Sequence, residues 1–320
     1  MTAGQIQYVA VVGAGTMGHG IGLDFARAGY DVALCDVSRQ ALEQAREQIE
    51  NELAELVSWG LFPVGEVPAT LARITTGALL REMAGDADLV IEAVPENLEL
   101  KRRVFRELDA VCPARTILAS NTSSYMPSML AAATERQDRV LGLHFFYPPS
   151  LIPLVEVVRG VSTSDRVVEA VRQAVEAAGK SPIVIHKEAM GFVANRLQMA
   201  LLREALFLIE QGIASAQDVD TAVHQGFGRR LAVAGPLEMA EVQDGWDVIR
   251  EIGRQILPHL DVSGQPSPLL NEKVARGELG PASGRGFYEW TEDGVQAWEV
   301  KLRRSLAGFL QAELPLRKAH

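Results

Sequence analysis

The sequence has few cysteines, no excess of positive charge and no long apolar run. Its two cysteines, Cys35 and Cys112, are too few for a disulfide framework, so we expect buried thiols in a reducing compartment. The formal net charge is −10 and no basic stripe occurs, which argues against a nucleic-acid partner. No apolar stretch approaches the roughly 20 residues that span a bilayer, and no basic segment precedes the first apolar run. We therefore expect no membrane span, no signal peptide and a cytoplasmic protein.

Two further absences limit the kinds of catalytic site expected in this chain. No group of His and Cys residues has the spacing of metal ligands, so no metal is expected. The G-x-S-x-G motif of serine hydrolases is also missing. What is present is a chain of 320 residues, 48% of them hydrophobic, which is enough for two domains with a sizeable core.

A glycine-rich turn follows the first apolar run. Residues 8–12 read as a buried parallel strand, and residues 13–18 have the G-x-G-x-x-G spacing before a helical pattern. In this spacing the first glycine makes the tight turn, the second lets the backbone approach a pyrophosphate, and the third lets the helix pack on the strand. The residues expected to contact a dinucleotide are Gly13, Gly15, Thr16, Met17 and Gly18.

Asp36 ends the second apolar run, at 32–35. A carboxylate there can accept hydrogen bonds from a ribose diol, and it repels a 2′-phosphate. The strand before the turn, the helix after it and the acid at this distance together predict NAD, rather than NADP, as the cofactor.

Strands and helices alternate up to about residue 188 and give way to helices beyond it. This pattern predicts a Rossmann-type, doubly wound parallel α/β sheet in residues 1–188, followed by an all-α domain in residues 189–320. The long apolar helix expected at 192–211 suggests a homodimer interface. The other strands are expected at 88–94, 116–119, 139–146, 154–158 and 181–185, and the later helices at 216–225, 238–257, 269–276 and 295–314, the last ended by Pro315 and followed by a frayed tail.

Four polar residues are placed to act together at the carboxyl ends of the strands, where ligands bind in such sheets. His144 lies near the end of one strand, and Glu156 lies inside the next apolar run, where an unpaired charge is costly. A histidine held by a carboxylate is fixed in tautomer and serves as a base for a hydroxyl proton. Ser123 and Asn195 can hydrogen-bond the reacting oxygen.

Each of these residues also has a structural alternative. A histidine at a strand end can be a buried structural residue, Glu156 can pair with Arg159 or Lys187, and Ser123 and Asn195 can cap backbone groups. The other five histidines are interpreted as structural or solvated.

Together these segments resemble the 3-hydroxyacyl-CoA dehydrogenase superfamily. The resemblance implies an NAD-dependent oxidation of a hydroxyl β to a carboxyl or thioester, with His144 as base, Glu156 as its partner, and Ser123 and Asn195 orienting the substrate. It also implies that Glu96 and Lys101 lie near the cofactor. The matching motifs are residues 13–18 with Asp36, and residues 92–97, 120–124, 142–146, 154–157, 191–197 and 283–288.

The sequence departs from the CoA-using members of that superfamily. They carry Asn, Lys and Pro where this chain has Tyr147, Pro153 and Met190, and their lysine-rich helical hairpin corresponds to residues 47–72, which contain five glutamates and no Lys or Arg. Anionic CoA needs cationic partners. Other segments resemble the λ-crystallin/L-gulonate 3-dehydrogenase and carnitine dehydrogenase branch.

We therefore expect an NAD-dependent dehydrogenase of a small hydroxy acid or polar alcohol. One alternative is an L-3-hydroxyacyl-CoA dehydrogenase of the 3-hydroxybutyryl-CoA type, and another is a non-enzymatic NAD-binding protein of the λ-crystallin type. Tyr147 is expected at the substrate pocket. Arg229 and Arg230 can face an anionic substrate or form a solvated basic pair.

Overall fold

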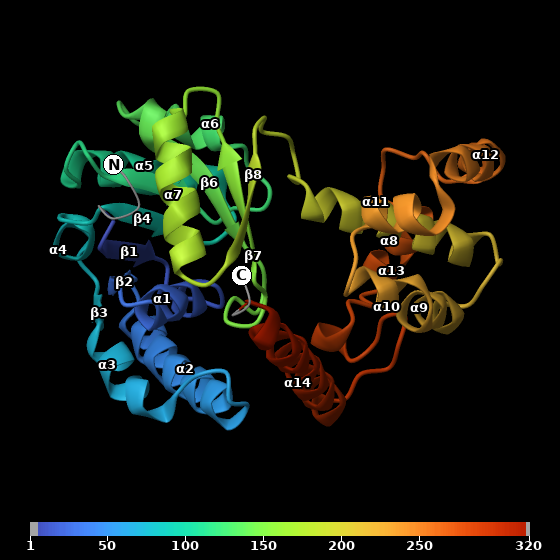
Figure 1. Cartoon of the computed structure of the whole chain (residues 1–320), viewed down its shortest axis with the longest axis horizontal. Helices are drawn as coiled ribbons and strands as arrows, with labels where there is room; N and C mark the ends of the chain where they lie inside the picture. Colours follow the sequence, from blue (N-terminus) through green and yellow to red (C-terminus); the bar gives the residue numbers. More distant parts are fainter. Residues whose placement is uncertain (1–5, 318–320) are drawn as a thin grey trace. The chain divides into compact units, whose positions relative to one another are not determined.

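The computed structural model describes residues 6–317, which form two compact units (Figure 1). The first unit contains the residues up to Asn195 together with those from Val300 onward, and the second is Arg196–Glu299. The predicted division after residue 188 assigns the end of the chain to the helical domain, whereas its contacts lie with the first unit.

The first unit contains a sheet of eight strands in the order β3-β2-β1-β4-β5-β6-β7-β8. All neighbours are parallel apart from β6 and β7, which are antiparallel. The Rossmann-type sheet is therefore confirmed. It has two reversed strands, β7 and β8, and an edge strand, β3, that was not predicted. The strands are β1 (Tyr8–Val12), β2 (Asp31–Cys35), β3 (Ile74–Gly77), β4 (Leu89–Glu92), β5 (Ile117–Ser120), β6 (Val140–Phe145), β7 (Leu154–Arg159) and β8 (Ser181–Ile185).

Helices cover both faces of this sheet, because successive side chains of a buried strand point to opposite sides. In β1, Val9 and Val11 pack on the face covered by α1 (Gly18–Arg27), α2 (Arg39–Ser58) and α7 (Asp165–Ala177). Ala10 and Val12 pack on the opposite face. The helices of that face are α4 (Leu80–Ala84), α5 (Leu98–Val111) and α6 (Pro127–Ala131), and the short α3 (Val67–Ala72) leads into β3.

The second unit is helical. The predicted continuous helix at 238–257 is wrong, because Gly245 has a φ of +78° that ends one helical segment and starts the next. No helix in the described part of the chain is long and apolar enough to cross a membrane. The helices are α8 (Ala194–Glu210), α9 (Ala216–Gln225), α10 (Phe227–Leu231), α11 (Pro236–Met239), the π-helical turn η4 (Ala240–Asp244), α12 (Trp246–Ile256) and α13 (Pro268–Ala275).

The last helix, α14 (Glu292–Arg317), brings the end of the chain to the first unit. Its Ala307 is buried in the core beneath α1 and α2, and Arg303 binds Glu55 of α2. The helix runs past Pro315, where it was predicted to end. The tail expected beyond it, at 318–320, lies outside the described residues.

Candidate active site

One cavity of about 930 Å³ opens where the carboxyl ends of β1, β2 and β4 meet. Sheet order reverses between β1 and β4, which is the position where open α/β sheets bind ligands. All the lining residues belong to the first unit. Those among them that the sequence singled out are Gly13, Gly15, Thr16, Met17, Asp36, Glu96, Lys101, Ser123, His144, Tyr147 and Asn195.

The glycine-rich turn joins β1 to α1 at the floor of this cavity. Gly13 has a φ of +106°, and a Cβ on Gly18 would lie 1.7 Å from the carbonyl oxygen of Gly13, so neither position accepts a side chain. A Cβ on Gly15 would point into open space instead, which leaves the backbone there accessible. Met17 gives α1 no side-chain cap, so no side chain occupies the N-terminus of the helix, and the positive end of its dipole can face an anion. The turn therefore fits a pyrophosphate.

Asp36 stands beside the turn at the end of β2. Its Oδ2 accepts from the N–H of Ala14 at 2.8 Å, and its Oδ1 accepts from the N–H of Ser38 at 2.8 Å. These bonds fix the carboxylate, and a carboxylate has about four acceptor positions. Two positions are left for the hydroxyls of a ribose.

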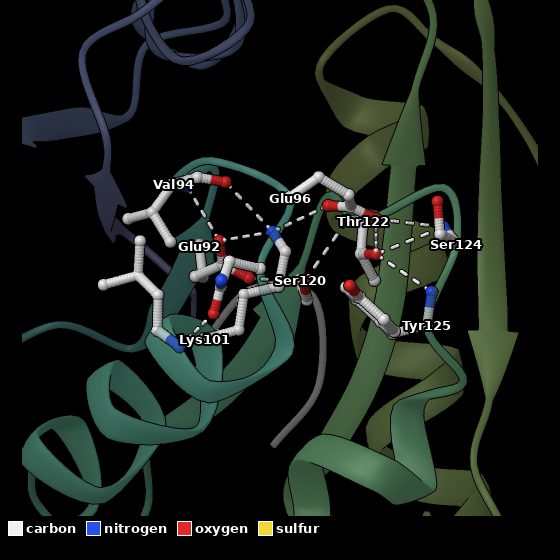
Figure 2. Close-up of polar contacts among 10 residues, drawn as sticks. Glu92, Val94, Glu96, Lys101, Ser120, Thr122, Ser124 and Tyr125 are labelled. Carbon is white, nitrogen blue, oxygen red and sulfur yellow. Dashed lines mark hydrogen bonds and ion pairs between the residues drawn. The ribbon is translucent and has the colours of Figure 1, made fainter.

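Lys101 also lines the cavity, and its side chain is 1% exposed. Figure 2 shows its ammonium group among Glu92, Val94 and Glu96. Nζ lies 2.8 Å from Glu92 Oε1, 3.0 Å from the carbonyl oxygen of Val94 and 3.1 Å from Glu96 Oε2. An ammonium group has three donors, so all of them are used within the protein. Lys101 thus lines the cavity and holds two glutamates, but offers no free N–H to a ligand.

Glu92 and Glu96 differ in exposure. Glu92 is fully buried and accepts from Ser120 Oγ at 2.5 Å and from the N–H of Val94 at 2.7 Å. Glu96 is partly exposed, and burial raises its pKa, but bonds from Thr122 and Lys101 outweigh this and leave the pKa below its usual value. Glu96 is the carboxylate of this group that faces the cavity in ionised form.

Ser123 follows β5 in a loop that this cluster orders. Thr122 donates from its hydroxyl to Glu96 and accepts from the N–H groups of Ser124 and Tyr125 at 3.2 and 3.1 Å. These bonds order the loop around Thr122, as Figure 2 shows. Ser123, in the same loop, lines the cavity.

His144 and Glu156 are directly opposite each other in the antiparallel pair β6–β7. Opposed residues of such a pair share one face of the sheet. Nδ1 of His144 lies 2.8 Å from Oε2 of Glu156, with both side chains buried. Since an ionised carboxylate can only accept, Nδ1 carries a proton in this contact, and Nε2 is the ring nitrogen left for another partner. The rings of Phe146 and Phe192 pack around the imidazole, with centroids 4.4 and 5.6 Å away.

Glu156 is also bound by the backbone that begins α8. Its Oε1 accepts from the N–H groups of Val193 and Ala194 at 3.0 and 2.9 Å. Burial raises the pKa of Glu156, but the hydrogen bonds from His144 and from these two amides outweigh it and lower the pKa. The carboxylate is therefore ionised, as a partner for an imidazolium must be.

The remaining predicted residues are divided between the units. Asn195, expected in the helical domain, groups with the first unit and lines the cavity, as does Tyr147 just after β6. Arg229 and Arg230 lie on α10 of the second unit, where Arg230 donates to Gln243 at 3.2 Å. They are not part of the cavity that the first unit forms.

The sequence interpretation assigned no role to several residues that shape this site. Glu92 anchors Lys101, and Asn121 lines the cavity and accepts from the N–H of Phe145 at 2.8 Å. A signal for Glu92 is present, because a glutamate inside the apolar run at 88–94 needs a buried cation.

A Rossmann sheet with this turn and an acid at the end of β2 defines a dinucleotide-binding oxidoreductase. The profile of the 3-hydroxyacyl-CoA dehydrogenase NAD binding domain matches residues 8–189, and that of the 3-hydroxyacyl-CoA dehydrogenase C-terminal domain matches residues 191–290. The chain belongs to the 3-hydroxyacyl-CoA dehydrogenase family, and it is an NAD-dependent oxidoreductase acting on CH–OH groups.

Relatives with different substrates match most of the chain. The probable 3-hydroxybutyryl-CoA dehydrogenase of Bacillus subtilis is 37% identical over 90% of this chain and 99% of that protein. The 5-formyl-3-hydroxy-2-methylpyridine 4-carboxylate 5-dehydrogenase of Mesorhizobium japonicum is 33% identical over 94% and 96%.

Solved structures show the same two kinds of relative. The structure of a 5-formyl-3-hydroxy-2-methylpyridine 4-carboxylic acid 5-dehydrogenase, described as an NAD⁺-dependent dismutase, matches with a TM-score of 0.90 at 32% identity, over 96% of this chain and 98% of that one. That of (S)-3-hydroxybutyryl-CoA dehydrogenase from Ralstonia eutropha matches with a TM-score of 0.76 at 33% identity, over 90% and 100%.

Proposed function

We propose that this dehydrogenase oxidises the hydroxyl group of a small free hydroxy acid or related polar alcohol to the ketone, with His144 as general base. The observation that carries the mechanism is the buried pair of His144 and Glu156, of which His144 lines the cavity. A base must reach the proton it abstracts, and Nε2 is the ring nitrogen free to do so.

Each side chain of the site has a separate role in the proposed reaction. Ser123 and Asn195 hydrogen-bond the substrate oxygen and direct its hydroxyl toward Nε2 of His144. His144 takes the hydroxyl proton, and Glu156 stabilises the resulting imidazolium without taking the proton itself. The glycine turn and Asp36 would hold NAD, which would supply the acceptor for the hydride of the carbinol carbon. Ketone, NADH and one proton are the products.

The charge of residues 47–72 supports a substrate that is not a CoA thioester. This segment comprises most of α2, all of α3 and the turn between them, and its charged residues are all glutamates. A polyphosphate ligand needs Lys or Arg partners. The relative with the TM-score of 0.90 is named for a pyridine carboxylate rather than for a thioester.

The substrate test compares kcat/KM for 3-hydroxybutyryl-CoA with values for a panel of free 3-hydroxy acids and polar alcohols. We expect a free acid or alcohol to give the higher value. A much higher value for the thioester would instead establish the alternative, a 3-hydroxyacyl-CoA dehydrogenase, which the 37% identity to the Bacillus subtilis protein favours. If none of the alcohols were oxidised, the remaining alternative would be a non-enzymatic NAD-binding protein.

The same assay tests Asp36 through the choice of cofactor. NAD is expected to give a higher kcat/KM than NADP, because the carboxylate repels a 2′-phosphate. Replacing Asp36 with Ser should reduce this preference. An enzyme that used NADP at least as well as NAD would contradict the role given to Asp36.

The helical unit is proposed to form a homodimer. Large apolar side chains are exposed on α8, including Leu197, Met199 and Leu201, and on α12, including Trp246 and Ile252. Exposed apolar patches of this kind mark association surfaces. Sedimentation equilibrium at micromolar concentration should give twice the mass of one chain, and a monomer would contradict the proposal.

A further inference from the structure

His19 lies directly behind the glycine-rich turn, in the first turn of α1, and its side chain is 6% exposed. Nδ1 lies 2.9 Å from the carbonyl oxygen of Gly15, and Nε2 lies 3.4 Å from Oε1 of Glu52 on α2. A backbone carbonyl can only accept, so Nδ1 carries a proton. The Nε2 contact with Glu52 is an ion-pair distance, and the imidazolium is the form of His19 that an ionised Glu52 stabilises there.

The charges around the pair support ionisation of both partners. Burial raises the pKa of Glu52, but the contacts with His19 and Arg303 outweigh it, and the pKa is lowered. Burial lowers the pKa of His19, but the contacts with Glu52 and the Gly15 carbonyl outweigh it, and the pKa is raised. Arg303 of α14, whose Nη2 is 3.7 Å from Glu52 Oε1, acts against the charge on His19. The charged groups acting on His19 are thus Glu52 from α2 and Arg303 from α14.

A positive charge on His19 can compensate the negative charge of a bound pyrophosphate. Among the described residues that line the cavity, Lys101 is the only Lys or Arg, and its three donors are already used. The pyrophosphate of NAD brings two negative charges to a turn that otherwise offers backbone N–H groups and a helix N-terminus. His19 stands behind the same turn and bonds to its Gly15.

We propose that His19 is a cationic positioning residue for the dinucleotide. As an imidazolium it fixes the carbonyl of Gly15 and places positive charge behind the pyrophosphate-binding turn. It also ties cofactor affinity to pH and to the charges on α2 and α14. Because coupling between two binding events is reciprocal, phosphates that favour the imidazolium bind more tightly when His19 is protonated. Affinity should therefore be highest at low pH and fall as pH rises through the titration of His19.

The first measurement is the Kd for NADH, by fluorescence titration across about pH 5.5–9. In His19→Asn, the amide nitrogen can still donate to Gly15, but the charge and the Glu52 contact are lost. We expect the wild-type Kd to rise about tenfold across the titration, which corresponds to a coupling of one pKa unit. His19→Asn should keep the weaker value with a smaller pH dependence, since His144 is common to both proteins. Identical profiles for the two proteins would overturn the proposal.

The second measurement needs no turnover. The ring ¹⁵N signals of His19, assigned by their loss in His19→Asn, report its protonation in the free enzyme, and two protonated nitrogens are expected near neutral pH. Glu52→Gln should lower the titration midpoint, and Arg303→Met should raise it. Arg172→Met, which removes a surface ion pair on α7, is the matched control and should leave the midpoint unchanged. A neutral imidazole at pH 6, or midpoints that do not move, would refute the charge assigned to His19.

Discussion

Replacing His144 with alanine is expected to lower kcat about a hundredfold or more while leaving the affinity for NADH unchanged, because general-base catalysis contributes about 10²–10⁴. The variant removes Nε2, the proposed proton acceptor, and keeps the glycine turn and Asp36 that are expected to hold the cofactor. The loss should appear in kcat rather than in KM, since the proton moves only in the transition state. Steady-state kinetics with the best substrate of the panel, together with an NADH titration, measure both quantities.

His186→Ala is the matched control for this variant. His186 belongs to the same unit but is exposed and does not line the cavity, so its removal should leave kcat unchanged. Full activity in His144→Ala would rule out the proposed mechanism. A loss of NADH binding that matched the loss of kcat would show a structural role for His144 in place of a catalytic one.

Lys101→Met is expected to lower the free energy of unfolding by about 3–5 kcal/mol, the usual cost of removing one partner from a buried ion pair. Lys101 and Glu92 are both almost fully buried, and the ammonium group compensates the carboxylate at 2.8 Å. Without it, the carboxylate of Glu92 is left charged in the protein interior. Urea denaturation measures the change.

Two further variants test whether the unpaired buried charge causes this loss of stability. Lys101→Met combined with Glu92→Gln should regain part of the lost stability, because no unpaired charge is then buried. Arg172→Met removes a cation from an exposed ion pair with Glu169 and should change stability far less. Equal losses in Lys101→Met and Arg172→Met would show that the buried cluster does not stabilise the fold as proposed.

Several features of the first unit could be predicted from the sequence, because each has a recognisable residue pattern with a known physical cause. The close approach of Gly18 to the carbonyl of Gly13 acts within residues 13–18, and the cap of α2 by Ser38 is equally local. The pairing of His144 with Glu156 was one of several open alternatives, and the structure gives a 2.8 Å contact between them. A buried carboxylate needs a partner, and the neighbouring strand supplies one.

Other features depend on contacts that sequence patterns do not reveal. The short connection at residues 146–153 indicates that β7 runs antiparallel to β6, because it has too few residues for a parallel crossover. The composition of a strand alone does not indicate its direction. The edge strand β3 is short and half-exposed, so its apolar pattern is weak. The contact of His19 with Glu52 joins two helices, α1 and α2, so no pattern within either segment of the sequence indicates it.

The return of the last helix to the first unit affects how the protein is made. Its Ala307, with Leu306 and Leu310 beside it, completes a core that otherwise consists of α1, α2, α7 and the sheet. About a hundred residues of the other unit must leave the ribosome before this helix can be added, so a nascent chain that stops at Asn195 exposes the apolar surface that α14 later covers. The dinucleotide-binding unit is therefore completed only after the other unit has been synthesised, and truncations that remove α14 should impair its folding.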